Sequence, residues 1–195
     1  IFNENVRDLK RKELNINNRI VIGHVGRFHP QKNHDFIIEI FNSIYLQNKN
    51  VVLLLVGDGD LRNKIENKAR NLNLLNNVIF TGVRDDVNDL FQAMDVFLFP
   101  SKFEGLGIVA IEAQASGLPV IASDVLPKEV EISNLIKFIS LNMNSEYWAR
   151  NIIERLNVIK DRRNMKNEVI DSKYDIVYSA NWLQDKYIMI YKNTR

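Results

Sequence analysis

Short, mostly apolar runs that alternate with amphipathic stretches constrain the fold of this chain more than any other feature of its sequence. The runs, rich in β-branched and aromatic residues, lie at residues 20–25, 51–56, 78–80, 96–99, 119–122 and 136–139. An apolar run of this length without polar alternation is typical of a strand that is buried on both faces of a sheet. Such a sheet needs a helical layer on each face.

The stretches between the runs have the periodicity of helices. After the first run, apolar residues follow the 3.6-residue period of a helix, at Phe36, Ile37, Ile40, Phe41 and Ile44. Asn33 is predicted to cap this helix, and Gly117 is predicted to end a later one at roughly residues 107–116. From Ser145 onward the pattern is helical throughout, with one helix at residues 147–159 and a long one at the end.

The predicted fold is therefore α/β, a Rossmann-like doubly wound parallel sheet of about six strands with helices on both faces and a helical C-terminal tail. Residues 1–18 are polar and are interpreted as an entry segment, and residues 1–195 as a single domain. The last helix carries an apolar stripe at Ile176, Val177, Ala180, Leu183, Tyr187, Ile190 and Tyr191. This stripe is longer than an end helix needs, so we expect part of it to cover a partner domain.

Composition excludes several classes of function. The net charge of +2 argues against nucleic acid as a partner. The chain contains no cysteine, which removes disulfides, thiolate metal sites and cysteine nucleophiles together. Its longest apolar run, residues 51–56, is far shorter than the roughly 20 residues of a membrane helix.

The loop that follows the first predicted strand contains two cations, Arg27 and Lys32, after the strand-end residue Gly26. In a doubly wound sheet, ligands bind outside the carboxyl ends of the strands, where this loop lies. The planar fork of arginine and the mobile charge of lysine together suit a diphosphate. The alternative interpretation is that both are solvated loop cations.

A second group of candidates follows the fourth predicted strand. Glu104 lies in the loop after this strand, and Glu112 lies in the second turn of the next helix. Gly105 and Gly107 allow a ligand to approach the backbone closely, and the helix start offers free amides to an anion. Apolar neighbours in the sequence predict that Glu112 is partly buried. The alternative places Glu112 on a solvent face and makes Glu104 an anion at a helix start.

Taken in order, these motifs resemble family 4 of the glycosyltransferases, which have the GT-B fold. The matching patterns are Gly-Arg with its later Lys, Pro-Ser-x-x-Glu-Gly-x-Gly-x-x-x-x-Glu-Ala and Gly-x-Pro-Val, with the turns 56–59 and 80–82 at the family's positions. Glu104 and Glu112 form the E-x7-E pattern of retaining members. The resemblance covers residues 15–135 strongly and the tail weakly, and residues 82–129 are especially similar to enzymes of exopolysaccharide or capsule synthesis.

The resemblance implies a role for each matching residue. Arg27 and Lys32, next to Gly26, would bind the donor diphosphate and stabilise the charge that develops as it leaves. Glu104 would hold hydroxyls of the donor sugar, and Glu112 would accept from the ribose hydroxyls. The implied backbone contacts are Leu106 and Gly107 to the sugar, Ile108 and Val109 to the phosphates, and Val83 and Arg84 to the base.

The resemblance also implies a protein longer than this chain. The chain would be the C-terminal, donor-binding domain, and the N-terminal acceptor domain would be absent from it. The donor would be a nucleoside-diphosphate sugar, transferred with retention to a glycan or lipid-linked acceptor, without a metal or other cofactor. The protein would be cytoplasmic, and the full-length form could contact the inner face of the membrane. Because the acceptor must be held near the anomeric carbon, we expect the isolated chain to bind a donor without turnover.

Several residues that invite a function are assigned none. Asp58-Gly59-Asp60 resembles a D-x-D metal motif but is interpreted as a turn that opens a helix, and His24, His29 and His34 lack the spacing of metal ligands. Trp148, Trp182 and the tyrosines of the tail are predicted to serve in packing and not as stacking platforms for a ligand. Arg162 and Arg163 are predicted to form a solvated face.

Three other functions remain as alternatives at this point. A sugar-nucleotide epimerase or synthase could use the same two-domain fold, and a non-catalytic module could bind the same nucleotide sugar. A nicotinamide-binding domain is disfavoured, because no G-x-G-x-x-G motif joins the first strand to its helix.

Overall fold

The computed structural model describes residues 2–158, 162–163 and 165–193. Its centre is a parallel sheet of six strands in the order β3-β2-β1-β4-β5-β6. The strands are β1 (Ile20–Val25), β2 (Val51–Val56), β3 (Val78–Gly82), β4 (Val96–Phe99), β5 (Val120–Ser123) and β6 (Ile136–Ile139). The helices are α1 (Glu4–Glu13), α2 (His34–Gln47), α3 (Arg62–Asn71), α4 (Val87–Ala93), α5 (Ile108–Ala115), α6 (Ser145–Val158), α7 (Lys166–Asp171) and α8 (Ile176–Asn193). Each predicted strand is confirmed, and so is the doubly wound fold.

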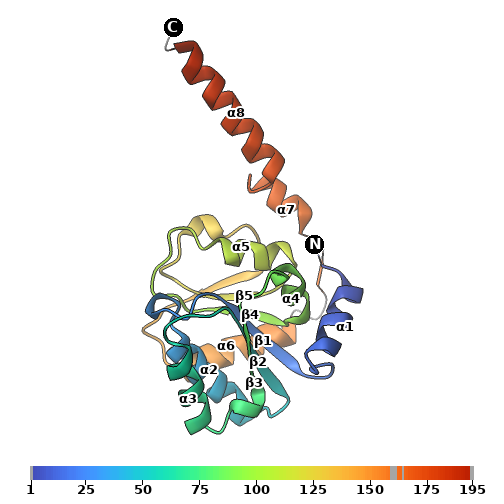
Figure 1. The fold of residues 1–195 in the computed structure, drawn as a ribbon, viewed down its shortest axis with the longest axis vertical. Helices are drawn as coiled ribbons and strands as arrows, with labels where there is room; N and C mark the ends of the chain where they lie inside the picture. Colours follow the sequence, from blue (N-terminus) through green and yellow to red (C-terminus); the bar gives the residue numbers. More distant parts are fainter. Residues whose placement is uncertain (1, 159–161, 164, 194–195) are drawn as a thin grey trace.

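Two hydrophobic cores lie on the two faces of the sheet, as the central strand β2 shows. Its residues Val51, Leu53 and Leu55 pack in one core with the apolar faces of α2, α3 and α6. The residues between them, Val52, Leu54 and Val56, pack in the other core with α4 and α5. All six side chains are buried, which explains why this strand has no polar position. Helices therefore cover both faces of the sheet (Figure 1).

One prediction about local structure, the side-chain cap of α2 by Asn33, is wrong, and two segments form helices whose bounds were not predicted. The entry segment forms the helix α1, which Asn3 caps by accepting a hydrogen bond from the amide of Val6. Asn33 precedes α2 in a left-handed conformation and makes no side-chain cap. Its side chain donates instead to the carbonyl of Pro100 at 3.2 Å, because the loops after β1 and β4 meet here. The chain between α6 and α8 includes the short helix α7, in agreement with the helical pattern predicted from Ser145 onward.

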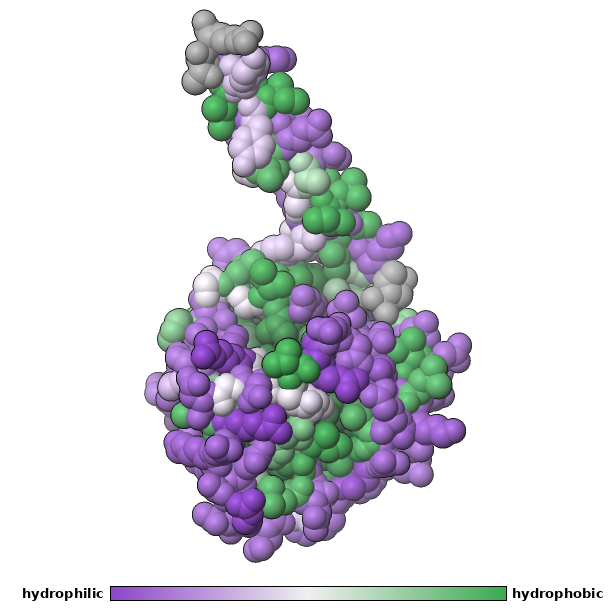
Figure 2. All heavy atoms as spheres, viewed as in Figure 1, coloured by the Kyte–Doolittle hydropathy of each residue, from purple (hydrophilic) through white to green (hydrophobic). Residues whose placement is uncertain are grey.

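The aromatic residues of the C-terminal region divide into two groups. Trp148 of α6 is fully buried, as predicted, and its indole N–H donates to the carbonyl of Ser140. In contrast, Trp182 of α8 is 52% exposed, and Tyr178, Tyr187 and Tyr191 are exposed as well. They do not pack in the interior of this domain, because α8 extends away from its body, with apolar side chains along its surface (Figures 1 and 2).

The prediction of a solvated Arg162 is also wrong, whereas Arg163 is exposed and pairs with Glu168. Arg162 donates to the carbonyls of Phe91, Gln92 and Met94 at the end of α4 and to that of Ser116 at the end of α5. Burial, followed by the charge of Arg7, lowers the pKa of Arg162 to about 9. This side chain thus satisfies carbonyls at the ends of two helices.

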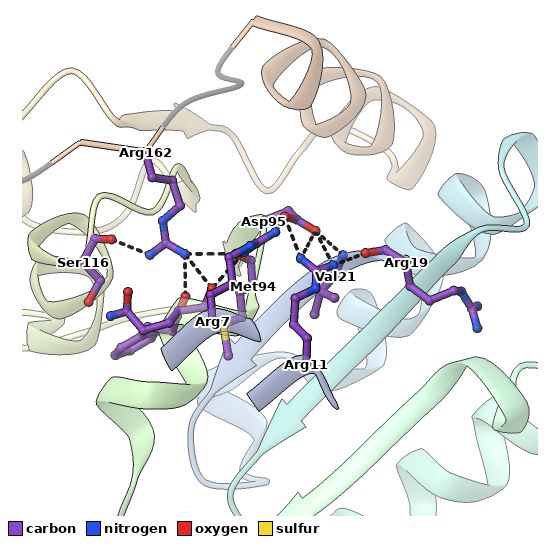
Figure 3. A network of polar contacts seen from close by, with 10 residues as sticks. Arg7, Arg11, Arg19, Val21, Met94, Asp95, Ser116 and Arg162 are labelled. Atoms are coloured by element: carbon purple, nitrogen blue, oxygen red, sulfur yellow. Dashed lines mark hydrogen bonds and ion pairs between the residues drawn. The ribbon is translucent and has the colours of Figure 1, made fainter. Parts of the chain in front are cut away.

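Asp95, directly before β4, is the centre of the same polar network (Figure 3). Its carboxylate accepts from Arg7 and Arg11 of α1 and from the backbone amide of Val21 at 2.7 Å. Arg11 is almost fully buried, and its guanidinium also donates to the carbonyl of Arg19. One carboxylate therefore holds α1 against the amino-terminal edge of the sheet.

We expect Asp95→Asn to lower the free energy of unfolding by roughly 3 kcal/mol, because it leaves two largely buried guanidinium groups without a counter-charge. Urea titration followed by circular dichroism measures this loss. Asp171→Asn, an exposed substitution at the end of α7 with the same change in charge, serves as the control. A loss below 0.5 kcal/mol for Asp95→Asn would show that Asp95 does not hold the network together.

Candidate functional site

The order of the strands reverses between β1 and β4. Backbone pairing joins Ile22 to Val96 and Gly23 to Phe97, whereas β1 continues beside β2 as far as Val25. The connections that follow β1 and β4 lead to opposite faces of the sheet. The two loops therefore lie on either side of the point where these connections diverge. This is the position at which doubly wound sheets bind ligands.

The carboxyl ends of β1, β2 and β3 are joined by backbone hydrogen bonds between their loops. The amide of Gly57 donates to the carbonyl of Gly82 at 2.9 Å, and the amide of Phe28 donates to that of Asp58 at 3.0 Å. A Cβ on Gly57 would lie 2.3 Å from the carbonyl oxygen of Gly26, and the φ of Gly57 is +129°. Only glycine fits at this position, so the first two loops approach each other at backbone distance.

The loop after β1 is also fixed to the loop after β4. The amide of Lys102 donates to the carbonyl of Gln31 at 2.8 Å, and the side chain of Gln31 donates to the carbonyl of Phe103 at 2.9 Å. The two predicted groups of site residues, which are distant in the sequence, consequently form one surface.

An ion pair between Lys32 and Glu104 lies at the centre of this surface. The ammonium of Lys32 is 2.6 Å from a carboxylate oxygen of Glu104, and the two side chains are only 17% and 8% exposed. The ammonium also lies 4.9 Å from the centre of the Phe99 ring. A largely buried pair of opposite charges beside a glycine-rich backbone can recognise a ligand that offers both an anion and hydroxyl groups.

Arg27, the second predicted cation, points elsewhere. Its side chain is 68% exposed, and its guanidinium is 3.6 Å from the carboxylate of Asp60 in the loop after β2. In that loop Asp58 accepts a hydrogen bond from the amide of Gly59, as expected for a turn that precedes α3. Arg27 thus lies at the exposed rim of the surface, beside Asp60 and not beside Glu104.

The start of α5 forms the wall beside the ion pair. Gly107, with a φ of +82°, turns the chain into the helix, and Ile108 is 61% exposed. The amides of Ile108 and Val109 belong to the first turn, which has no acceptors within the helix. Free amides at a helix start are donors that can bind an anion.

Glu112 lies one turn further along α5, where it is exposed at the surface and yet partly desolvated by its neighbours. It lines a hollow of about 390 Å³ together with Asn88, Asp89 and Gln92 of α4 and residues of α1. Partial desolvation in this hollow still raises the pKa of Glu112 above its ordinary value. The sequence correctly places Glu112 on α5, and the residues that line this hollow do not include Lys32 or Glu104.

Val83 and Arg84 follow β3 on the remaining side of the surface. Val83 is 78% exposed, so its backbone and side chain are accessible. The guanidinium of Arg84 pairs with Asp86 and with Glu13 of α1. These hydrogen bonds raise the pKa of Arg84 and hold that of Asp86 well below its usual range. The side chain of Arg84 is therefore engaged, and its backbone is what it can offer to a ligand.

Two histidines that sequence reasoning set aside lie directly beneath this surface. His24 of β1 and His34 of α2 are fully buried, with ring centres 4.8 Å apart. Burial, with a further contribution from the charge of Lys32, lowers the pKa of His34 to about 4. Spacing along the chain gave no signal for this pair, because one residue comes from a strand and the other from a helix.

A larger hollow, of about 690 Å³, opens at the opposite, amino-terminal edge of the sheet, where Arg7, Arg11, Asp95 and Arg162 form part of its wall. The bonds of these groups to one another and to backbone carbonyls account for them structurally. The carboxyl edge, which carries the glycine turns and the Lys32–Glu104 pair, is the stronger candidate for a functional site.

Comparison with known proteins identifies relatives of one family. The model of the family described as "Glycosyl transferases group 1" matches residues 6–171. The putative glycosyltransferase EpsF of Bacillus subtilis is 38% identical over 153 residues, which cover 78% of this chain and 40% of EpsF. An Escherichia coli protein named UDP-Gal:alpha-D-GlcNAc-diphosphoundecaprenol alpha-1,3-galactosyltransferase is 31% identical over 194 residues, covering 94% of this chain and 49% of that protein.

A solved structure has the same fold. HepE of Anabaena, determined in complex with UDP, superimposes with a TM-score of 0.81 at 22% identity, over 96% of this chain and 53% of that one. At this identity the likeness demonstrates the fold. The chain thus spans about half the length, or less, of the relatives that it matches.

The buried His34 makes a prediction about acid stability. In the folded protein it stays neutral down to about pH 4, whereas in the unfolded chain it takes up a proton near the ordinary pKa of 6.5. Between these values the unfolded state binds more protons, so stability falls as the pH decreases, by roughly 3 kcal/mol in total.

We expect His34→Phe to reduce this dependence. The measurement is urea unfolding of both proteins at pH values between 4.5 and 7.5, and the quantity compared is the slope against pH, which a constant difference in stability does not affect. Parallel slopes for the variant and the unmodified chain would show that His34 is protonated equally in both states.

Proposed function

We propose, since this chain belongs to the group 1 glycosyl transferases, that it is the part of a longer enzyme that binds a nucleoside-diphosphate sugar. The observation that carries this proposal is the Lys32–Glu104 pair, held between the loops after β1 and β4 at the reversal of the strand order. The lysine offers a positive charge to the diphosphate of such a donor, and the neighbouring carboxylate offers hydrogen-bond acceptors to the hydroxyl groups of its sugar.

Donor binding would exchange the partners of this pair. The diphosphate replaces Glu104 as the counter-charge of Lys32, and Glu104 then accepts hydrogen bonds from hydroxyls of the sugar. Arg27 is exposed and can swing from Asp60 to the same diphosphate. Both side chains are largely buried, and a buried charge without a partner is costly. The exchange avoids this cost, because each of the two groups gains a new partner.

The start of α5 completes the proposed donor site. The amides of Ile108 and Val109 face the phosphates, where the helix dipole favours negative charge. Leu106 and Gly107 face the sugar. Glu112, one turn further along, accepts from the ribose hydroxyls.

The nucleobase lies against the backbone at Val83 and Arg84. The exposure of Val83 and the ion pairs of Arg84 support this arrangement, because they leave an open backbone surface beside β3.

We propose a UDP-hexose as the donor and a lipid-linked glycan as the acceptor, in the synthesis of a bacterial surface polysaccharide. The name of the E. coli relative, which includes UDP-galactose and a diphosphoundecaprenol acceptor, supports both choices. The E-x7-E spacing of Glu104 and Glu112 supports assignment to family 4 and transfer with retention of the anomeric configuration.

In the proposed step, the bond between the anomeric carbon and the diphosphate oxygen breaks, and its electron pair leaves with UDP. A bond forms to the acceptor oxygen, whose proton is transferred to the leaving diphosphate. Lys32, Arg27 and the α5 amides stabilise the negative charge on that group. These donors make a metal ion unnecessary for the proposed step.

An N-terminal domain would supply the acceptor site, so the isolated chain is expected to bind a donor without transferring its sugar. The exposed apolar side chains of α8 are available to contact that domain. Within the residues that the structure describes, no helix is long and apolar enough to cross a membrane. We propose action in the cytoplasm, at the inner face of the membrane that carries the lipid-linked acceptor.

Replacing the cations tests the diphosphate contacts. We expect Lys32→Ala and Arg27→Ala each to weaken the binding of UDP by about 1.5–3 kcal/mol, the range for hydrogen bonds to charged groups. Isothermal titration calorimetry measures this, with Lys137→Ala, an exposed change on β6, as the control. Unchanged affinity in both site variants would contradict the proposed donor site.

The two glutamates are expected to act on different parts of the donor. Glu112→Gln should weaken the binding of UDP itself, because the ribose is present in that ligand. Glu104→Gln should spare UDP and reduce only the preference for UDP-hexose over UDP. Equal losses for both ligands in both variants would exclude this division.

A further inference from the structure

The strands β1 and β4 separate at the position where the proposed donor site begins. The backbones of the two strands pair at Ile22–Val96 and Gly23–Phe97. In contrast, β4 stays paired with β5 as far as Phe99. Beyond the paired residues a side chain makes the connection, since Nδ1 of His24 lies 2.9 Å from the carbonyl oxygen of Leu98. As a carbonyl can only accept, Nδ1 carries the proton in this contact.

The ring of His24 fills the space that opens between the two strands. It is fully buried and lies parallel to the ring of Phe97, with centres 6.1 Å apart, and 6.0 Å from that of Phe99. On its other side the ring of His34 meets it edge-on, and His34 in turn stacks on Phe28 with centres 4.1 Å apart. The ring of His24 is thus held by aromatic neighbours.

Lys32 and Gly26 lie directly over this ring. A Cβ on Gly26 would be 3.0 Å from Nε2 of His24 and 3.2 Å from Cγ of Lys32, so the glycine backbone lies close to both. Phe99, beside His24, is the same ring over which the ammonium of Lys32 lies. The floor under the lysine therefore consists of His24 and Phe99.

His24 has to be neutral to serve as this floor. Burial, then the proximity of His34, lowers the pKa of His24 well below its ordinary value, and the charge of Lys32 acts in the same direction. Nε2 of His24 and both nitrogens of His34 have no hydrogen-bond partner among the described residues. A neutral ring places no positive charge beneath the lysine.

We propose that His24 is a positioning residue for donor binding. Its ring lies between β1 and β4 and holds Lys32 in position opposite Glu104. The inference rests on the proposed function, because it assigns to His24 an effect on the nucleoside diphosphate that acts only through Lys32.

The test is a double-mutant cycle on the binding of UDP, measured by calorimetry on the full chain. His24→Phe keeps a ring but removes the N–H that donates to Leu98, and we expect it to raise the Kd of UDP about tenfold. His24→Asn keeps a donor near the position of Nδ1 and should recover part of this loss. In the Lys32→Met background, which has already lost the ammonium, His24→Phe should change the Kd less than twofold.

A stability control separates positioning from general damage. Ile152→Ala removes a fully buried side chain of α6 from the core and should lower stability without changing the Kd of UDP. Circular dichroism establishes the folded fraction of every variant. If His24→Phe does not fold, the cycle is carried out with His24→Asn, for which a smaller, equally Lys32-dependent loss is expected.

The outcomes are distinct. If the unmodified chain binds neither UDP nor UDP-glucose, the proposed function fails and the inference fails with it. If the unmodified chain binds UDP and Lys32→Met weakens binding, but His24 variants leave the Kd unchanged, the inference alone is overturned. The inference is also overturned if the loss is as large in the Lys32→Met background, because His24 then acts on the fold and not on the lysine.

Discussion

The burial of a parallel sheet on both faces is the constraint from which the rest of this structure follows. The all-apolar strand β2 cannot expose either face, so α2, α3 and α6 cover one and α4 and α5 cover the other. Connections that lead to opposite faces must diverge somewhere, and they do so between β1 and β4. The crevice at that point is a consequence of how the hydrophobic cores are covered.

Charges are distributed very differently at the two edges of the sheet. At the amino-terminal edge, Arg7, Arg11 and Arg162 are engaged by Asp95 and by backbone carbonyls, and they hold peripheral elements in place. At the carboxyl edge, Lys32 and Glu104 neutralise each other. A ligand with an anionic part and hydroxyl groups can provide a new partner for each of these two side chains at once. The contacts at the amino-terminal edge are suited to stabilising the fold, and the ion pair at the carboxyl edge is suited to exchanging its partners for a ligand.

Much of the candidate site could be predicted because its residues follow strand ends. Gly26, Lys32 and Glu104 each lie in a loop after an apolar run, and the carboxyl ends of parallel strands meet at one edge. The burial of individual side chains could not be predicted in the same way. Glu112 has apolar neighbours in the sequence yet is exposed, and Arg162 lies in a basic stretch yet satisfies the carbonyls of two helix ends. Both outcomes depend on which helices pack together.

The sequence by itself determined the strands, the helices that cover the two faces of the sheet, and the fold class, because strand and helix periodicities are local properties of the chain. It also determined which loops carry cations, carboxylates and glycines. Only the tertiary structure decided that Lys32 pairs with Glu104, that Arg27 lies apart beside Asp60, and that His24 bridges β1 and β4. Those contacts join residues that are distant in the sequence. Their geometry depends on how the strands separate and how the loops pack, and no local pattern records it.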